Sequence, residues 1–394
     1  MKKLLAFILL LFSFPTAYAA AEEPKDPAII SEAAIVTDSE SGAVLYAKNA
    51  DKKMYPASLT KIATAIYAIE NGDLRDIATI SKKAAEVEGT RVYLEEGEKV
   101  PLIKLVQGML INSGNDAAWS IAEHLDGNMK AFSENFNHYL EESAGLKNTH
   151  FVNPHGLFDE NHYTTAGDLA KLTNYALKNE TFREIYGTKE MKWAGKSWDT
   201  TIFTHHRMLK GEVPFEGVTG GKTGFVDEAK QTLATSAEND SIKLTAIVLK
   251  AEFKRDIYND TKNLLNYGFS NFETSTLSST DVFPSDGKTY TTGGENVAIT
   301  LPKGIYEEDI TSKGKLQIKN ENGRIIQSVK LLEDKQDEVV TSQLKTEKET
   351  GKETTGYYGR AGLIIFLFGI FILILRKNLK AKARRRRRRR RGRV

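Results

Sequence analysis

The chain has 394 residues, 40% of them hydrophobic, and no cysteine, so it can hold two domains with ordinary cores, and disulfides and thiol catalysis are excluded. Its net charge is +3, although 13 basic and no acidic residues lie between Arg376 and Val394. When those 13 residues and the N-terminal Lys2 and Lys3 are left out, 40 of the 55 basic residues remain, together with all 52 acidic ones. The rest of the chain therefore has a net charge near −12, which argues against nucleic acid as its partner.

The N-terminus has the features of a secretory signal peptide. Two lysines precede an apolar run from Leu4 to Phe14, and residues 17–19 form an A-x-A cleavage site. We therefore expect residues 1–19 to be a signal peptide and the following domains to lie outside the cytoplasm.

A helix predicted over residues 58–70 places a serine and a lysine side by side. Ile62 and Ile66 recur at helical spacing after the start. Ser58 and Lys61 are three residues apart, so their side chains share one face. A serine hydroxyl needs a base to become a nucleophile. A lysine can be that base when it is neutral, a state that burial and the helix dipole favour.

The S-x-x-K spacing alone does not single out Ser58. Three more matches begin at Ser285, Ser312 and Ser342, and for any one of them a solvated serine and lysine is the simpler interpretation. Ser58 is distinguished by the polar motifs that follow it in order.

The segments around this helix predict an α+β domain. A hairpin is expected over residues 28–48, and Thr165 is expected to cap a helix running to Leu177. The other expected elements are helices over 101–111, 116–125 and 255–269 and strands over 232–236 and 242–249. Because strands lie at both ends and helices between them, the sheet should join the first and last segments.

Two further polar motifs follow Ser58. Ser113-Gly114-Asn115 forms the exit between two apolar helices, where polar side chains can point into a cleft. Lys222-Thr223-Gly224 is the single K-T-G of the chain. A serine with its lysine, a second polar group and K-T-G, in that order, are the signature set of serine penicillin-binding enzymes.

The chain resembles the low-molecular-mass penicillin-binding proteins, a family of serine-type D-alanyl-D-alanine carboxypeptidases. Beyond the three motifs, the segments that carry the likeness are N-A-D at 49–51, F-x-N-P-x-G-L at 151–157 and H-Y-T-T-A at 162–166. The likeness covers residues 28–270, and a weaker one extends to about 340. It implies a β-lactamase/transpeptidase-like domain over 28–272, an antiparallel sheet flanked by helices, and a small all-β, sandwich-like domain over 274–342.

The resemblance also implies roles for the catalytic residues. Ser58 would attack the carbonyl of the penultimate D-alanine of a peptidoglycan stem peptide, and Lys61 would take its proton. Ser113 would relay a proton to the departing D-alanine, Lys222 would keep this network electropositive, and Asn115 would orient the peptide amide. β-Lactams would acylate the same serine, and neither a cofactor nor a metal is implied.

Substrate binding is expected from Lys222, Thr223, Gly224 and Phe225. The resemblance implies that Lys222 and Thr223 face the terminal carboxylate and that the backbone amides of Ser58 and Phe225 form the oxyanion hole. Phe225 departs from the family pattern, which often has a small or polar residue shortly after K-T-G, but its backbone N–H is retained.

Several other classes of protein fit the sequence less well. A class A β-lactamase would have S-D-N where Gly114 stands and a deacylating glutamate in E-x-x-L-N, which the chain lacks. A P-loop is excluded because its first glycine would fall on Glu216, and no H-E-x-x-H metal motif is present. His155 and His162 are interpreted as turn and core residues. A D,D-endopeptidase and a β-lactam sensor remain open, as does the oligomeric state.

The C-terminus predicts attachment to the cell membrane. Residues 343–356 form a Lys-, Glu-, Thr- and Gly-rich linker, and an uncharged run from Ala361 to Leu375 follows. That run is short for a span, but residues 357–376 reach the usual length of about 20. The basic residues of 377–394 predict a cytoplasmic tail by the positive-inside rule.

Overall fold

The computed structural model describes residues 25–334. The predicted signal peptide, linker, membrane anchor and basic tail lie outside these residues. Within the described part of the chain, every helix is too short or too polar to cross a membrane.

The region predicted to be catalytic, residues 28–272, is centred on a five-stranded antiparallel sheet with the order β2-β1-β9-β8-β7. Its strands are β1 (Ala33–Asp38), β2 (Val44–Lys48), β7 (Val218–Val226), β8 (Lys230–Glu238) and β9 (Lys243–Ala251). Because β1 pairs with β9, the prediction that the sheet joins the first and last segments of this region is confirmed. Strand β7, which carries the K-T-G motif, lies at one edge of the sheet.

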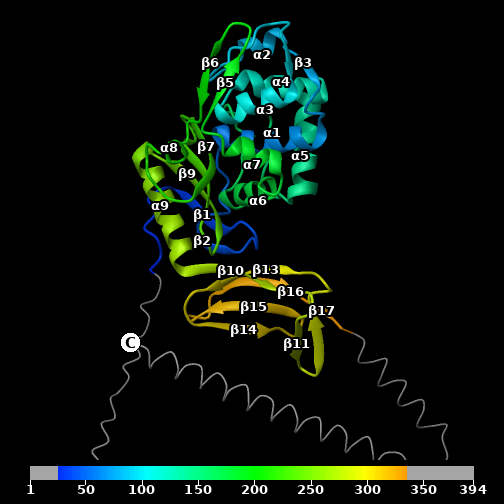
Figure 1. Cartoon of the computed structure of the whole chain (residues 1–394), viewed down its shortest axis with the longest axis vertical. Coiled ribbons are helices and arrows are strands. Elements are labelled where there is room, and N and C mark those ends of the chain that lie inside the picture. The colour runs from blue at the N-terminus through cyan, green and yellow to red at the C-terminus, as the bar shows by residue number, and fades with distance from the viewer. Residues whose placement is uncertain (1–24, 335–394) are drawn as a thin grey trace, which may run out of the picture. The chain divides into compact units, whose positions relative to one another are not determined.

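Helices cover both faces of the sheet, as Figure 1 shows, with α9 on one side and most of the other helices on the other. The helices are α1 (Thr60–Asn71), α2 (Lys82–Glu86), α3 (Leu102–Ile111), α4 (Asn115–Asp126), α5 (Met129–Ala144), α6 (Ala166–Ala176), α7 (Glu180–Tyr186), α8 (Arg207–Lys210) and α9 (Lys254–Asn271). Successive residues of β9 alternate between two cores: Ile247 packs with α1 and α3–α7, and Val248 packs with α9. The sheet is therefore apolar on both faces.

Two pairs of short strands complete this region. Strands β3 (Ile77–Thr79) and β4 (Lys99–Pro101) pair across a connection that contains α2, and β5 (Glu190–Ala194) and β6 (Asp199–Phe203) form a hairpin. These strands and the helices α2, α5, α7 and α8 were not predicted from the sequence. Helix α5 buries only Phe132, Phe136 and Leu140, a narrow stripe in an otherwise polar segment.

The predicted helix over 58–70 is divided in the structure. A 3₁₀ turn, η1 (Ala57–Leu59), carries Ser58, and α1 begins only at Thr60. Ala57 has a φ of 49°, a conformation that a residue with a Cβ adopts at a steric cost. Ser58 is thus held by a tight, strained turn in front of the helix.

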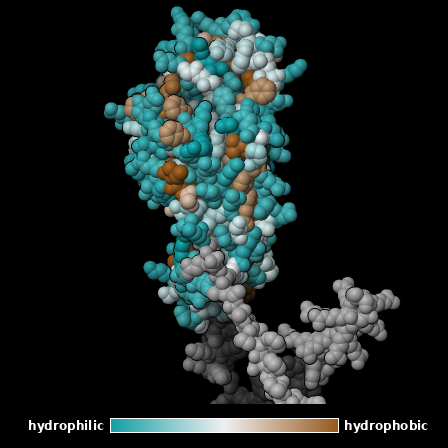
Figure 2. Space-filling model, turned by 90° about the vertical axis from the view of Figure 1, so that its left-hand side faces the viewer, coloured by the Kyte–Doolittle hydropathy of each residue, from teal (hydrophilic) through white to brown (hydrophobic). Residues whose placement is uncertain are grey.

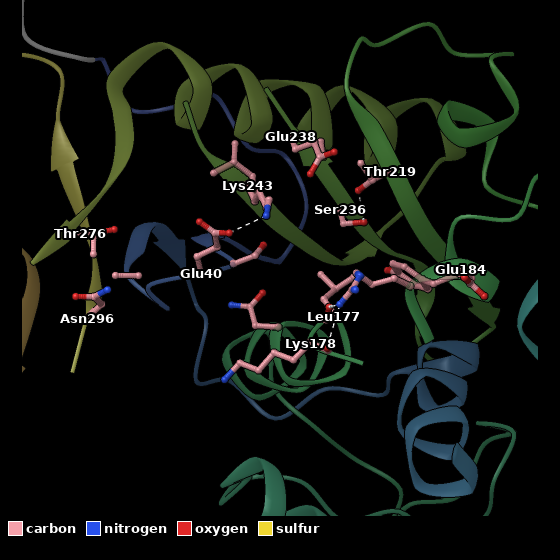
Figure 3. Close-up of a pocket in the computed structure, with 17 residues that line it drawn as sticks. Glu40, Leu177, Lys178, Glu184, Thr219, Ser236, Glu238, Lys243, Thr276 and Asn296 are labelled. Carbon is pink, nitrogen blue, oxygen red and sulfur yellow. Dashed lines mark hydrogen bonds and ion pairs between the residues drawn. The ribbon is translucent and has the colours of Figure 1, made fainter. Parts of the chain in front are cut away.

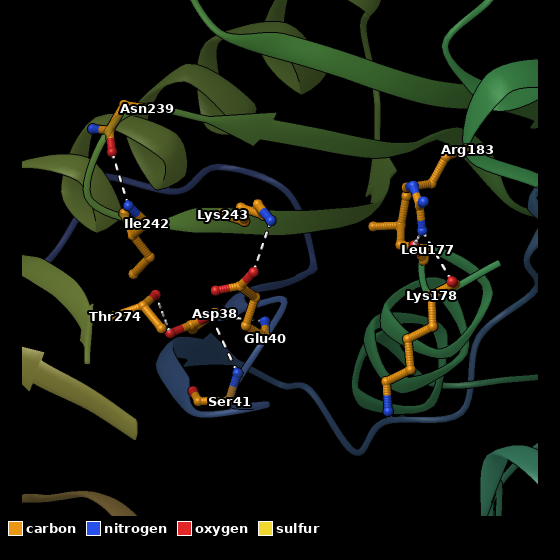
Figure 4. A network of polar contacts seen from close by, with 10 residues as sticks. All are labelled: Asp38, Glu40, Ser41, Leu177, Lys178, Arg183, Asn239, Ile242, Lys243 and Thr274. Carbon is orange, nitrogen blue, oxygen red and sulfur yellow. Dashed lines mark hydrogen bonds and ion pairs between the residues drawn. The ribbon is translucent and has the colours of Figure 1, made fainter. Parts of the chain in front are cut away.

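A small all-β module follows α9, where the sequence predicted an all-β domain over residues 274–342. Its strands are β10 (Phe272–Leu277), β11 (Val282–Ser285), β12 (Lys288–Thr291), β13 (Val297–Pro302), β14 (Tyr306–Ile310), β15 (Lys315–Asn320), β16 (Ile325–Lys330) and β17 (Leu332–Glu333). The fully buried carboxylate of Asp38 ties it to β1 by accepting a hydrogen bond from the hydroxyl of Thr274 at 2.8 Å (Figure 4). The same carboxylate accepts one from the hydroxyl of Thr300 at 2.7 Å. Removing the carboxylate would leave both hydroxyls without this partner.

The described surface carries no large apolar face in the view of Figure 2, which is mostly hydrophilic with small, separate apolar patches. The exposed large apolar residues include Phe225 and Phe253 of the catalytic region and Val282 and Ile305 of the β module. Scattered residues of this kind are ordinary on a soluble surface.

Candidate active site

Lys61 is the most informative residue of the site because it is fully buried and has three polar neighbours. Its Nζ lies 2.9 Å from Ser58 Oγ, 2.7 Å from Asn115 Oδ1 and 2.8 Å from the carbonyl oxygen of His155. The amide and carbonyl oxygens can only accept hydrogen bonds. A neutral amine satisfies both with its two hydrogens, and its lone pair then faces the hydroxyl of Ser58.

The electrostatics of the site favour this neutral amine. Burial lowers the pKa of Lys61 well below its usual 10.5, and the positive charge of Lys222 lowers the pKa further, while Asp116 opposes the shift. Asp116 is also fully buried, and burial raises the pKa of its carboxyl group. No carboxylate forms an ion pair with Lys61 among the described residues.

Ser113 and Lys222 form the second part of the site. Lys222 Nζ lies 3.0 Å from Ser113 Oγ and donates to the carbonyl oxygen of Thr223 at 2.9 Å. Burial lowers the pKa of Lys222 to about 7. Ser113 has a φ of 64°, the second strained backbone position beside a site hydroxyl. The three predicted motifs therefore converge, although they come from distant parts of the chain.

Asn115 is fixed by the loop that precedes α3. Its side-chain amide donates to the carbonyl oxygen of Glu88 at 2.6 Å, and its backbone N–H donates to that of Thr90 at 2.7 Å. Asp116 holds the same loop by accepting from the backbone N–H groups of Val92 and Leu94. Within the S-G-N-D sequence, Asn115 thus directs its side-chain oxygen toward Lys61, and Asp116 holds the preceding loop in place.

Gly224 allows the nucleophile turn to lie against strand β7. A Cβ at this position would come within 2.8 Å of the backbone nitrogen of Ser58 and 2.4 Å of Thr232 Oγ1. Thr232 in turn donates to the carbonyl oxygen of Pro56 at 3.0 Å. The segments that carry the two predicted oxyanion-hole amides, those of Ser58 and Phe225, therefore meet at the glycine of K-T-G.

A cleft of about 300 Å³ opens onto these groups and is lined by Ser58, Thr90, Ser113, Thr223 and Phe225. His205, Arg207 and Lys254 also line it, and sequence reasoning did not assign them to the site. Helix α8 and the start of α9 bring them there, and the H-H-R run at 205–207 was the only signal in the sequence. Burial and the neighbouring lysines lower the pKa of His205 to about 4, so its ring is neutral at neutral pH. Lys254 adds positive charge to the cleft, whereas Arg207 forms an ion pair with Glu212 at 3.0 Å.

A larger cavity, of about 1010 Å³, lies elsewhere, between the turn after β1, helices α6 and α7 and the β module (Figure 3). It contains none of the predicted site residues. Its cations, Lys178, Arg183 and Lys243, are matched by Glu40, Glu184 and Glu238, and Lys243 pairs with Glu40 at 2.7 Å. We place the chemistry in the smaller cleft because the buried lysines and the serines converge there.

Residues 19–253 match the protein family described as D-alanyl-D-alanine carboxypeptidase. The match spans more than half of the chain. This chain belongs to that family.

Relatives in this carboxypeptidase family align over most of the chain. D-alanyl-D-alanine carboxypeptidase DacF of Bacillus subtilis is 33% identical over 70% of this chain and 72% of its own length. D-alanyl-D-alanine carboxypeptidase DacA of Haemophilus influenzae is 30% identical over 88% of this chain and 91% of its own length. The likeness to the second relative therefore extends beyond the residues matched by the family.

Solved structures of the family have the same fold. Penicillin binding protein 5 of Haemophilus influenzae is 27% identical, with a TM-score of 0.67 over 78% of this chain and 98% of that one. The Streptomyces K15 DD-transpeptidase is 28% identical, with a TM-score of 0.58 over 62% of this chain and 100% of that one. The predicted transpeptidase-like fold is thereby confirmed.

The geometry of the two lysines predicts how acylation depends on pH. Only neutral Lys61 can take a proton, so the rate should fall as the pH drops through its lowered pKa. Because the charge of Lys222 lowers that pKa, Lys222→Gln should raise it and move the acidic limb of the profile to higher pH. The measurement is the rate of Ser58 acylation by a fluorescent penicillin between pH 4 and 9. A limb that stays in place or moves to lower pH would contradict this coupling.

Proposed function

We propose that this chain is a serine D-alanyl-D-alanine carboxypeptidase that removes the terminal D-alanine from peptidoglycan stem peptides during maturation of the cell wall. The observation that carries the proposal is the fully buried amine of Lys61, whose Nζ lies 2.9 Å from Ser58 Oγ. Membership of the carboxypeptidase family supports the choice of substrate.

Acylation begins when Ser58 Oγ attacks the carbonyl carbon of the penultimate D-alanine. The hydroxyl proton passes to Lys61 Nζ, and the negative charge on the former carbonyl oxygen is stabilised by the amides of Ser58 and Phe225. As the peptide C–N bond breaks, the leaving D-alanine nitrogen takes a proton from Ser113, and Ser113 recovers one from Lys222, whose Nζ lies 3.0 Å from its hydroxyl. The product is an ester between Ser58 and the shortened stem peptide.

Deacylation reverses the roles of the same groups. Water replaces the departed D-alanine, loses a proton to the lysine–serine network and attacks the ester carbon. Ser58 Oγ then leaves and recovers a proton from Lys61. β-Lactams acylate Ser58 by the same first step and inhibit because the opened ring remains attached to the acyl group.

The cleft also suits a substrate that ends in a carboxylate. Thr223 lines it together with Arg207 and Lys254, and Lys222 lies beside Thr223. A carboxylate can accept charge-assisted hydrogen bonds from such groups. This arrangement supports cleavage at the C-terminus of a peptide in preference to cleavage within a chain.

Replacing the nucleophile tests the proposal directly. Purified wild-type ectodomain should release D-alanine from a peptide that ends in D-Ala-D-Ala. Ser58→Ala should release none and should not be labelled by a fluorescent penicillin, while its circular dichroism and thermal unfolding remain those of the wild type. Equal labelling of the variant would exclude Ser58 as the nucleophile. A wild type that is labelled but releases no D-alanine would instead indicate a β-lactam sensor.

Thr223→Val tests recognition of the carboxylate because it keeps the side-chain shape and removes the hydroxyl. One charge-assisted hydrogen bond is worth about 1.5–3 kcal/mol, so kcat/KM for the peptide acid should fall about ten- to a hundredfold. The same peptide with a C-terminal amide should lose much less, because that bond is already weakened. Equal decreases in kcat/KM for the acid and the amide would show that the Thr223 hydroxyl does not bind the carboxylate.

We propose that the protein is exported and held in the cell membrane by residues 357–376, with residues 377–394 in the cytoplasm. The uncharged run followed by 13 basic residues supports this topology. Protease added to intact protoplasts should remove the ectodomain and spare an epitope tag placed after Val394. Digestion of the tag together with the ectodomain would contradict a spanning anchor.

A further inference from the structure

The turn in front of Ser58 is held by a hydrogen bond to its backbone. Thr60 Oγ1 donates to the carbonyl oxygen of Ala57 at 2.9 Å, and Ala57 is the residue with the φ of 49°. Gly156 packs on the same carbonyl so closely that a Cβ there would lie 1.9 Å from the oxygen. The Ala57 carbonyl is therefore fixed by the hydroxyl of Thr60 and by a glycine contact, in addition to the hydrogen bond that it accepts from the backbone N–H of Thr60.

His162 determines which way the Thr60 hydroxyl donates. The backbone N–H of Val152 donates to His162 Nδ1 at 3.1 Å, so this nitrogen carries no proton. The neutral ring then has its proton on Nε2, which lies 2.8 Å from Thr60 Oγ1. Burial lowers the pKa of His162 to about 3, so the neutral form prevails at ordinary pH. The bonds therefore run in one direction, from Val152 through His162 and Thr60 to Ala57.

The planar peptide bond between Ala57 and Ser58 links this series of hydrogen bonds to the active site. The carbonyl of Ala57 and the N–H of Ser58 belong to one rigid plane and, in a trans peptide, point in opposite directions. Fixing the carbonyl therefore fixes the direction of the N–H. The nitrogen of Ser58 lies next to Gly224 of strand β7, on the side of the proposed oxyanion hole.

We propose that Thr60 and His162 are positioning residues that aim the Ser58 amide into the oxyanion hole through the carbonyl of Ala57. Neither side chain touches the substrate in this arrangement. They act on the transition state alone, because the oxyanion forms only after attack. The inference rests on the proposed acylation of Ser58 and adds a group of residues that the three motifs do not contain.

Two substitutions of Thr60 form a matched pair. Thr60→Val keeps the branched shape and removes the hydroxyl, whereas Thr60→Ser keeps the hydroxyl. Loss of a whole oxyanion donor costs about 10²–10³ in rate, so a misdirected donor should cost at least about tenfold in the acylation rate constant. Thr60→Ser should remain within about threefold of the wild type by the same reasoning. Stopped-flow acylation by benzylpenicillin separates this rate constant from the dissociation constant of the first complex, which should not change.

Thr173→Val controls for a purely structural effect. Thr173 is also fully buried, and its hydroxyl donates to a backbone carbonyl, that of Leu169, at 2.7 Å within α6. This substitution removes the same kind of hydrogen bond outside the cleft. It should lower stability to a degree comparable with Thr60→Val and leave the acylation rate constant unchanged. If both variants slow acylation equally, Thr60 acts through stability and the proposal is wrong.

His162 is tested by replacement with residues that differ in hydrogen bonding. His162→Gln retains one acceptor and one donor and should recover most of the acylation rate. His162→Phe keeps the stacking of a ring on Phe151, whose centroid lies 4.8 Å away, but has neither group, and it should slow acylation as Thr60→Val does. Identical rates for His162→Phe and the wild type would overturn the proposal.

These measurements remain informative if the proposed peptide substrate is wrong. Acylation by benzylpenicillin reports on Ser58 and its oxyanion hole without any release of D-alanine. A wild type that is acylated but does not hydrolyse the peptide would refute the carboxypeptidase activity and still allow the Thr60 and His162 comparisons. A fast-acylating Thr60→Val with normal peptide hydrolysis would refute the positioning role alone.

Discussion

The burial of Lys61 without an acidic partner is the constraint on which the active site depends. A buried ammonium ion is costly unless a counter-charge compensates it, so burial lowers the pKa of Lys61 and favours the neutral amine. Asp116, the buried carboxylate that acts on it, uses its oxygens to accept bonds from backbone amides of the neighbouring loop. The fold thereby favours the neutral amine that the proposed base requires, and it surrounds this amine with carbonyl and amide oxygens in place of a second charge.

The rest of the catalytic region brings partners to this amine and keeps water from solvating it. Helix α1 presents Lys61, the exit from α3 presents Ser113 and Asn115, and the edge strand β7 presents Lys222. An edge strand leaves one side unpaired, and a glycine in it lets the turn of Ser58 approach the backbone. The sheet therefore acts as the common support on which three distant segments meet.

Two of the seven non-glycine residues with positive φ in the described part of the chain lie at the site. Ala57 and Ser113 both have positive φ, each beside or at a hydroxyl of the site. Such conformations persist only when surrounding contacts outweigh their cost. At Ala57 those contacts come from Thr60 and Gly156, which hold the carbonyl and leave the following amide free to face the cleft. In the proposed arrangement, the buried hydrogen bonds to the Ala57 carbonyl thus set the direction of the Ser58 amide.

The sequence by itself determined the motifs, their order and the helices around S-x-x-K and S-G-N, because these motifs are read from residue types and because apolar periodicity reports buried faces. Only the tertiary structure decided which atoms complete the site: the carbonyl oxygens of His155, Glu88 and Thr90 around Lys61 and Asn115, and the cations of α8 and α9 at the cleft. Every residue has a backbone carbonyl, so no residue type marks the few that accept a catalytic hydrogen bond. Their choice depends on contacts between segments far apart in the chain, which a local pattern cannot contain.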